Sequence, residues 1–198
     1  MDSRTRLVEA TQDLLWEQGY SATSPKDIMR RSGAGQGSMY HHFTNKQELA
    51  VEALERSAQS MRHDAEKLLA TDGSAYEIAT AYLRRQRDVL KGCRMGRMTF
   101  DADVLNTPEL IEPVTRTFVW LLEALTVLFE RGRDQGEFAA DIDARNLASL
   151  VVATVQGGYV LARATRDTDA FDAAVEGAAA LLRKATVPLT TEVSDHSE

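Results

Sequence analysis

Apolar residues recur at three- and four-residue spacing along most of the chain, and runs that alternate apolar with polar residues are few. Such spacing places the apolar side chains on one face of an α-helix. The first stripe contains Leu7, Leu14 and Leu15, and it predicts a helix over about residues 3–18 that ends at the flexible Gly19. The whole pattern predicts an all-α fold and assigns no strand.

Start and stop signals place eight more helices after the first, which gives a nine-helix arrangement. Ser24 is a preferred N-cap, Pro25 fits the first helical turn, and a glycine-containing break at residues 32–35 ends this second helix. Thr44 is the expected cap of the fourth helix, with Gln47 reaching back to its backbone. The other helices are expected at about residues 36–43, 44–70, 74–90, 98–105, 108–136, 143–165 and 169–186.

The length of 198 residues is sufficient for a small domain followed by a larger one. Cys93 is the only cysteine, so an intramolecular disulfide or a zinc cluster built from cysteines cannot form, which fits a reducing cytosol. We find no apolar run of the roughly 18–20 residues that a membrane-spanning helix needs, and no secretory signal at the N-terminus. We therefore expect a cytoplasmic protein with no membrane partner, no metal and no other cofactor.

The net charge of -7 is unfavourable for binding nucleic acid, but the position of the charges matters more than their sum. Residues 21–47 carry Lys26, Arg30, Arg31 and Lys46 against the single acidic residue Asp27. This basic region coincides with two short helices joined by a glycine-containing turn, which is the arrangement of a helix-turn-helix. The local charge therefore favours double-stranded DNA as a partner.

The start of the helix at residues 36–43 suits contact with DNA bases. A reading helix needs small or hydrogen-bonding side chains there, because the base edges of the major groove lie directly below. Gln36 can pair with an adenine edge, and Ser38 is compatible with a base or a phosphate. Tyr40 and His41, one turn further on, can donate hydrogen bonds to phosphate oxygens.

Residues 4–55 carry a specific set of motifs: Gly19-Tyr20, Ser24-Pro25-Lys26-Asp27-Ile28, Ser32-Gly33, and Ser38-Met39-Tyr40-His41-His42-Phe43 followed by Lys46 and Leu49. This set resembles the DNA-binding domain of the tetracycline-repressor (TetR) family. The resemblance implies that Lys26 reaches a base or the flanking backbone and that Lys46 clamps a phosphate. The expected DNA-contacting residues are Lys26, Gly35, Gln36, Gly37, Ser38, Tyr40, His41 and Lys46.

The same resemblance implies an effector pocket among the fourth to eighth helices. Methionine side chains adapt to irregular shapes, and Gln86, Thr154 and Tyr159 are suited to orient a polar group. The expected pocket residues are Met61, Tyr82, Gln86, Met95, Met98, Phe100, Phe118, Leu122, Leu125, Thr154 and Tyr159. Methionine and aromatic residues at helical spacing are also ordinary core residues, and that alternative stays open.

The last two helices have apolar faces that are too wide for the rest of a small chain to cover. We therefore expect a homodimer with a four-helix interface, in which Ala153, Gly157 and Gly158 allow close approach. Two reading helices about 34 Å apart would then address successive major grooves of a palindromic operator. The interface residues expected from this pattern are Leu147, Leu150, Val151, Thr154, Val155, Gly158, Leu161, Phe171, Val175, Ala178, Ala179 and Leu182.

The combined expectation is a dimeric transcriptional repressor that a small apolar or amphipathic effector releases from DNA. We expect a DNA-binding domain over residues 1–47, a ligand-binding and dimerisation domain over 48–187, and a disordered tail over 188–198. A helical small-molecule-binding protein without DNA function and a transcriptional activator remain as alternatives. An enzyme is not favoured, because the chain has no glycine-rich phosphate loop and no metal-ligand spacing. A metal site at His41 and His42 is not favoured either, because these residues are adjacent on a helix and point about 100° apart.

Overall fold

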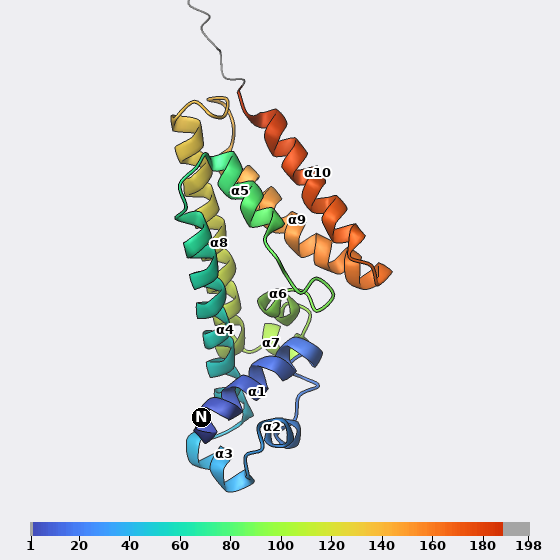
Figure 1. The fold of residues 1–198 in the computed structure, drawn as a ribbon. Coiled ribbons are helices and arrows are strands. Elements are labelled where there is room, and N and C mark those ends of the chain that lie inside the picture. Colours follow the sequence, from blue (N-terminus) through green and yellow to red (C-terminus); the bar gives the residue numbers. More distant parts are fainter. Residues whose placement is uncertain (1, 188–198) are drawn as a thin grey trace, which may run out of the picture.

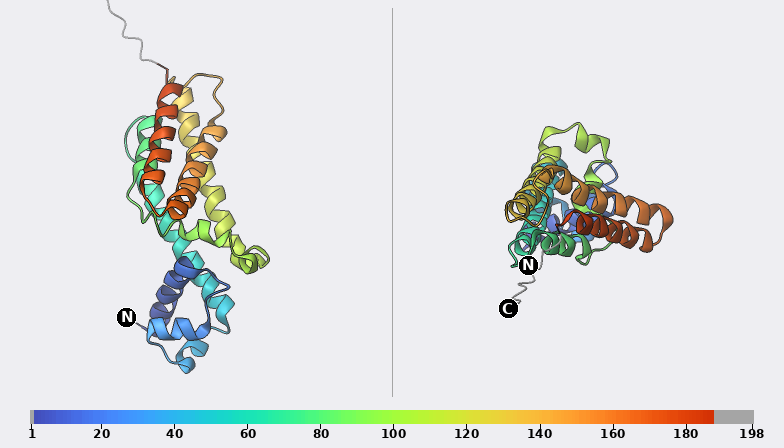
Figure 2. Two further views of the ribbon diagram at one scale, coloured as in Figure 1. Left: turned by 90° about the vertical axis from the view of Figure 1, so that its right-hand side faces the viewer. Right: turned by 90° about the horizontal axis from the view of Figure 1, so that it is seen from above.

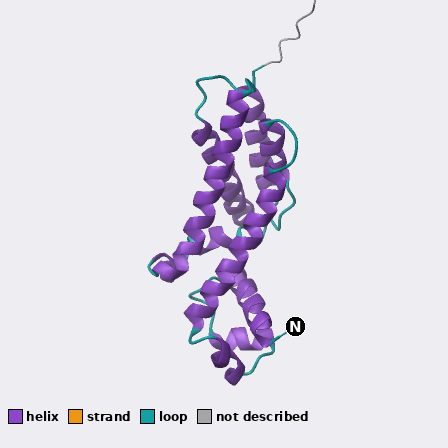
Figure 3. Ribbon diagram, turned by 90° about the vertical axis from the view of Figure 1, so that its left-hand side faces the viewer, coloured by secondary structure: helices purple, strands orange, loops and turns teal. Residues whose placement is uncertain are grey.

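The computed structural model describes residues 2–187, and this part of the chain forms ten helices. The only strand-like contact among these residues is an isolated bridge between Phe138 and Thr186. The expected all-α fold is confirmed (Figure 3). Ten helices replace the expected nine because one short predicted helix is divided into two. The tail expected at 188–198 lies outside the described residues.

Three short helices form a head at one end of an elongated molecule (Figure 1): α1 (Ser3–Gln18), α2 (Pro25–Ser32) and α3 (Gln36–His42). Local capping groups explain where α1 ends and where α2 begins. Gly19, with a φ of 86°, ends α1, and Ser24 forms a capping box with Asp27 at the start of α2. Leu7, Ile28 and Met39 are fully buried and hold the three helices together.

Two long helices, α4 (Lys46–Leu69) and α8 (Pro108–Asp134), lie side by side, and α4 connects the head to the body (Figures 1 and 2). The expected cap of α4 is wrong by one residue. The side chain of Asn45, not Thr44, accepts from the backbone N–H of Glu48 at 2.9 Å, and Glu48 accepts from the N–H of Thr44 at 2.6 Å. Gln47 instead donates to Glu109 at 3.3 Å.

The middle of the chain contains three short helices, α5 (Ala75–Arg84), α6 (Arg94–Met98) and α7 (Ala102–Leu105). The prediction that the fifth helix extends through Val89 and Leu90 is wrong, because both lie in the loop that follows Arg84. The guanidinium of Arg87 folds back and donates to the carbonyls of Tyr82 and Leu83 at 2.5 and 2.7 Å, which satisfies the end of α5.

The prediction of a single helix at residues 98–105 is also wrong. The chain turns at Thr99 and Phe100, and Asp101 then caps α7 by accepting from the N–H of Asp103 at 3.2 Å. Gly96 lies inside α6, so the chain is helical at residues 94–98, where no helix was expected before residue 98.

The last two helices, α9 (Ala144–Thr165) and α10 (Asp169–Ala185), form a pair that packs against α8 and α5. The length and apolar composition of α9, with a mean hydropathy of 1.3 over 18 residues, would be enough for a membrane span. Polar residues such as Asn146 and Gln156 interrupt α9, so it meets this limit by average composition and is not the continuous apolar run that was sought in the sequence. Helices of this kind are also typical of cores and interfaces in proteins without a membrane segment, and α9 contributes Val151, Val155 and Ala162 to the body core.

The core divides into two clusters of buried side chains. One lies in the body between α5, α8, α9 and α10 and includes Phe129 and Leu182. The other joins head residues with Met95 and Met98 of α6 and with Val104 of α7. The head is thus packed directly on α6 and α7, so a change at these short helices reaches the head through contacting side chains.

Candidate nucleic-acid interface

The α3 helix presents most of its predicted contact residues at the outer end of the head (Figure 1). Gly35, Gln36 and Gly37 are exposed, and Tyr40 keeps 49% of its surface accessible. Met39 on the opposite face of the same helix is fully buried in the head core. One apolar anchor therefore fixes α3 while its polar face stays free to meet a partner.

The two glycines at the start of α3 are not required by the fold. A Cβ atom added at Gly35 or Gly37 would have no heavy atom within 4 Å, and neither residue has a positive φ. Gly33 differs, because its φ of 67° is the left-handed conformation that ends α2. Open space beside the backbone of Gly35 and Gly37 is the geometry expected where a partner approaches the helix closely.

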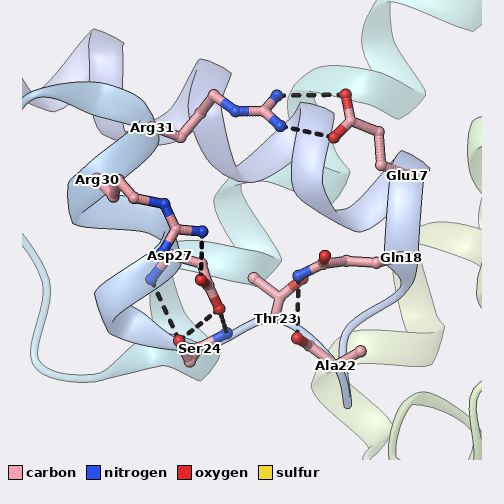
Figure 4. Close-up of polar contacts among 8 residues, drawn as sticks. All are labelled: Glu17, Gln18, Ala22, Thr23, Ser24, Asp27, Arg30 and Arg31. Atoms are coloured by element: carbon pink, nitrogen blue, oxygen red, sulfur yellow. Dashed lines mark hydrogen bonds and ion pairs between the residues drawn. The ribbon is translucent and has the colours of Figure 1, made fainter.

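Two of the three basic residues of α2, Arg30 and Arg31, are paired with carboxylates within the head, as Figure 4 shows. Arg30 pairs with Asp27, and Arg31 pairs with Glu17 of α1, each at 2.6 Å. Exposed ion pairs of this kind contribute little to stability. Phosphate oxygens can therefore replace these carboxylates at small cost. Lys26 is exposed at the first turn of α2 and forms no ion pair within residues 2–187.

Lys46 has a different environment from the exposed phosphate clamp that the family resemblance implies. It is half-buried, and its Nζ donates to the carbonyls of Tyr20 and Thr23 at 3.1 and 3.0 Å. Burial lowers the pKa of Lys46, and the carboxylates of Asp103 and Asp101 act in the opposite direction. This lysine ties the start of α4 to the loop between α1 and α2.

The remaining predicted contact residues lie along the same edge of α3. Ser38 is half-buried and His41 is exposed. The Nε2 atom of His42 lies 2.8 Å from the Oγ atom of Ser3, which joins the end of α3 to the start of α1. Among the described residues, no group of three or more His, Cys, Asp or Glu side chains is placed to hold a metal ion.

The predicted pocket residues do not converge on one cavity. Most of them are packed into the two cores, where Met95, Met98 and Leu125 are fully buried. Gln86 lies exposed in the loop after α5, and Met61 borders a shallow groove between α1 and α4. The others in the body core or against it are Tyr82, Phe118, Leu122 and Tyr159, while Thr154 is half-exposed on α9.

Two of these residues, Phe100 and Tyr159, do line one cleft. This cleft has a volume of about 330 Å³ and lies between the end of α1, the α6 segment and α9. Its wall also contains Gln18 of the head, Arg97 of α6 and Arg163 of α9. It is thus located at the joint between the head and the body, outside the bundle of helices in which we expected a pocket.

Two contacts that the sequence did not reveal fasten the head to the body beside this cleft. The Nε1 atom of Trp16 donates to the carbonyl of Gly92 at 2.9 Å. The backbone N–H of Ser21 donates to Asp101 at 2.8 Å, and its hydroxyl donates to the other carboxylate oxygen at 2.5 Å. The partners are about eighty residues apart in sequence, so no local motif indicates them.

The exposed apolar face of α9 and α10 overlaps only in part with the predicted interface, at Leu150, Ala153, Gly157 and Leu161. Most of the predicted interface residues are buried between these helices and the body, and Gly158 packs against Phe171 so closely that a Cβ atom would lie 2.8 Å from the ring. The prediction is wrong for these inner residues: Val151, Val155, Gly158, Phe171, Val175, Ala178, Ala179 and Leu182. The exposed or half-exposed apolar face contains Leu150, Ala153, Gly157, Leu161, Ala173, Gly177, Ala180 and Leu181.

Two known protein families match most of this chain. Residues 7–53 match the family described as bacterial regulatory proteins, tetR family. Residues 73–178 match the family described as tetracyclin repressor-like, C-terminal domain. The two matches cover the head and most of the helical body.

Individual proteins of this kind are also similar to the chain over most of its length. The uncharacterized HTH-type transcriptional regulator YxaF of Bacillus subtilis is 25% identical over 92% of this chain and 96% of its own length. The transcriptional repressor ComR of Escherichia coli is 26% identical over 81% of this chain and 79% of its own length. A TetR transcriptional regulator of Chloroflexus aurantiacus has a similar structure, with a TM-score of 0.85, 27% identity, and coverage of 93% and 96% of the two chains.

Proposed function

The chain belongs to the tetracycline-repressor family of bacterial regulatory proteins, and we propose that it is a ligand-responsive repressor that binds a palindromic operator as a homodimer. Family membership makes it a helix-turn-helix transcriptional regulator and not an enzyme. We further propose that it represses transcription, forms a dimer, contacts an operator, responds to an effector and is located in the cytoplasm.

The free polar face of α3 is the observation that carries the proposal for DNA. Gln36 reads a base edge, and Gly35 and Gly37 let the helix backbone approach the groove closely. Lys26, Ser38, Tyr40 and His41 contact the phosphate backbone on either side and fix the register. Because Arg30 and Arg31 have only exposed carboxylate partners, they add charge to this surface when DNA displaces those partners.

The outer face of α9 and α10 supports the homodimer. Its small residues leave room for helices of a second chain, since a Cβ atom at Gly157 or Gly177 would have no neighbour within 4 Å. Leu161 and Leu181 expose 51% and 58% of their surface on this face, and burial in a dimer removes that apolar area from water. A two-fold dimer also gives two heads, which match two half-sites of an operator.

Binding to the DNA upstream of the chain's own gene tests the proposal. Fluorescence anisotropy with a labelled duplex from that region is expected to show saturable binding by two chains per operator. The logarithm of the binding constant should fall linearly with the logarithm of the salt concentration, because bound phosphates release counterions. An unrelated duplex of equal length is the control. If no duplex, including the native promoter, is bound in a salt-dependent manner, the proposal fails.

A reporter gene behind the same operator tests the direction of regulation. We expect its expression to fall when the protein is present, as for a repressor. A rise in expression would show an activator that makes the same DNA contacts.

A further inference from the structure

We propose that the cleft between α1, α6 and α9 binds a small anionic amphipathic molecule, such as a carboxylate that carries an apolar chain or ring. This inference rests on the proposed function, because it makes the cleft the effector site of that regulator. The volume of about 330 Å³ is at the lower end of the range for ligand pockets. The expected occupant is therefore small.

The charges in the wall of the cleft favour an anion. Arg97 and Arg163 both line it, and neither forms an ion pair within the part of the chain that the structure describes. The Nε atom of Arg97 is buried without a hydrogen-bond partner among those residues. Burial lowers the pKa of Arg97 and the nearby charge of Arg163 lowers it further, whereas the carboxylate of Asp101 raises it. Two guanidinium groups that lie close together without an ion pair form a site for a carboxylate.

The single carboxylate in the wall, Asp101, acts on Arg97 through space but forms no ion pair with either arginine among the described residues. Its two oxygens accept hydrogen bonds from the backbone N–H and the hydroxyl of Ser21, at 2.8 and 2.5 Å. The wall therefore carries two positive charges against one negative charge that is already bound to the head. An anionic group fits this balance, whereas a cationic group would face two arginines.

The rest of the wall suits an apolar portion with one or two polar contacts. Phe100 exposes 78% of its surface, which is unusual for so large an apolar side chain, and it borders the cleft. Burial raises the pKa of Tyr159 to about 12, so its phenol stays protonated and can donate a hydrogen bond. Gly96 leaves space for the amide of Gln156, because a Cβ atom there would lie 2.3 Å from its Oε1.

The cleft is also placed to act on the head. Asp101 and Gly92 both belong to its wall, and both accept hydrogen bonds from the head, from Ser21 and Trp16 respectively. An anion bound by Arg97 and Arg163 repels the carboxylate of Asp101 and weakens its attachment to Ser21. Occupancy of the cleft thereby changes how firmly the head is held against the body, which is the coupling that release from DNA requires.

Isothermal titration calorimetry with matched acids and amides tests the site without DNA. Octanoate and phenylacetate are the anionic ligands, and octanamide and phenylacetamide are their neutral counterparts. We expect the acids to bind about tenfold more tightly than the amides, since a charged hydrogen-bonded pair contributes that much. Arg97→Gln and Arg163→Gln should each weaken octanoate binding about tenfold. Arg145→Gln, an exposed arginine on α9 outside the cleft wall, is the control and should bind as the natural chain does.

Three results would overturn the assignment: no binding of either acid, equal binding of acids and amides, or an equal loss in the Arg145 variant. Thermal melting of each variant checks that it is folded. Octanoate should also lower the affinity of the natural chain for its operator and leave that of Arg163→Gln unchanged. Arginine-dependent binding of the acids by a protein that binds no duplex would support the site and contradict the proposed function.

Discussion

The ammonium group of Lys46 lies 3.8 Å from the centre of the Tyr20 ring and donates to the Tyr20 carbonyl at 3.1 Å. A second hydrogen bond, to the carbonyl of Thr23 at 3.0 Å, closes the arrangement. The first residue of α4 thus holds the loop that leads into the helix-turn-helix. An ammonium has three donors, so one is left beyond these two hydrogen bonds, and a phosphate oxygen would compete for it with the Tyr20 ring.

Replacement of Lys46 by alanine is expected to reduce both stability and DNA affinity. The free energy of unfolding should fall by roughly 1.5–3 kcal/mol, as for hydrogen bonds from charged groups. The slope of the logarithm of the binding constant against that of salt should fall by about one. Urea unfolding and anisotropy at several salt concentrations measure the two effects.

Lys26→Ala is the matched control, since Lys26 is exposed and forms no ion pair within the described chain. It should weaken DNA binding and leave the free energy of unfolding unchanged. An unaltered salt slope in Lys46→Ala would remove Lys46 from the DNA interface and leave it as an internal tie.

Gln36→Ala is expected to change specificity more than affinity. The exposed amide of Gln36 can pair with one adenine edge in each half-site, and such a pair discriminates by about 1–3 kcal/mol. Competition among operators that differ at one base pair per half-site should show a relaxed preference at a single position. Tyr40→Phe, which removes only a phosphate donor, should weaken binding to all of these operators alike. A uniform loss in Gln36→Ala would argue against base reading by this residue.

Most helix boundaries were predictable because capping groups are close together in the sequence. Ser24 and Asp27 are three residues apart, and Gly19 directly follows the helix that it ends. The end of α5 was missed because it depends on how the guanidinium of Arg87 folds back onto Tyr82 and Leu83. Apolar residues at Val89 and Leu90 continue the helical spacing although the helix has ended.

The parts of the site that could be predicted are likewise those whose residues are close together in the sequence. The predicted contact residues of α3 belong to one short segment with a recognisable motif, whereas the cleft is built from three segments that only the fold brings together. The apolar stripes of α9 and α10 were located correctly, since Phe171, Val175, Ala178, Ala179 and Leu182 are the buried residues of α10, but they were assigned to a second chain and not to the body. A helical period marks the face that is buried and does not say which partner covers it.

Leu161→Glu is expected to separate the dimer into monomers. A charge on the outer face of α9 would be buried in the proposed dimer without a partner, which is strongly unfavourable. Sedimentation equilibrium should show a mass of one chain, and operator affinity should fall because two heads no longer act together. Leu105→Glu is the control, since Leu105 of α7 has the same 51% exposure as Leu161. A dimer that persists in Leu161→Glu would show that another surface joins the chains.

Alanine substitutions at two adjacent glycines of α9 separate internal packing from the outer face. Gly158→Ala places a Cβ atom 2.8 Å from the Phe171 ring, whereas Gly157→Ala has no neighbour within 4 Å. Both gain the same helix propensity, so Gly158→Ala should be less stable than Gly157→Ala by about 1–3 kcal/mol, the usual cost of overpacking. Urea unfolding in the Leu161→Glu background keeps dimerisation out of the comparison. Equal stability of the two variants would contradict the close contact with Phe171.

The hydrogen bonds between Ser21 and Asp101 should respond to acid in a defined direction. Burial opposes ionisation of Asp101, but the hydrogen bonds from Ser21, together with those from the backbone of Val104 and Tyr20, outweigh it and hold the pKa of Asp101 below its ordinary value of 3.8. The ionised form is therefore favoured in the folded state. Its contribution to stability is complete above pH 3.8 and is lost as the pH falls through the lowered pKa. The amide resonance of Ser21, followed by NMR, should titrate with a midpoint below 3.8 and should not titrate in Asp101→Asn. A midpoint above 3.8 would show that this contact does not favour the charged carboxylate.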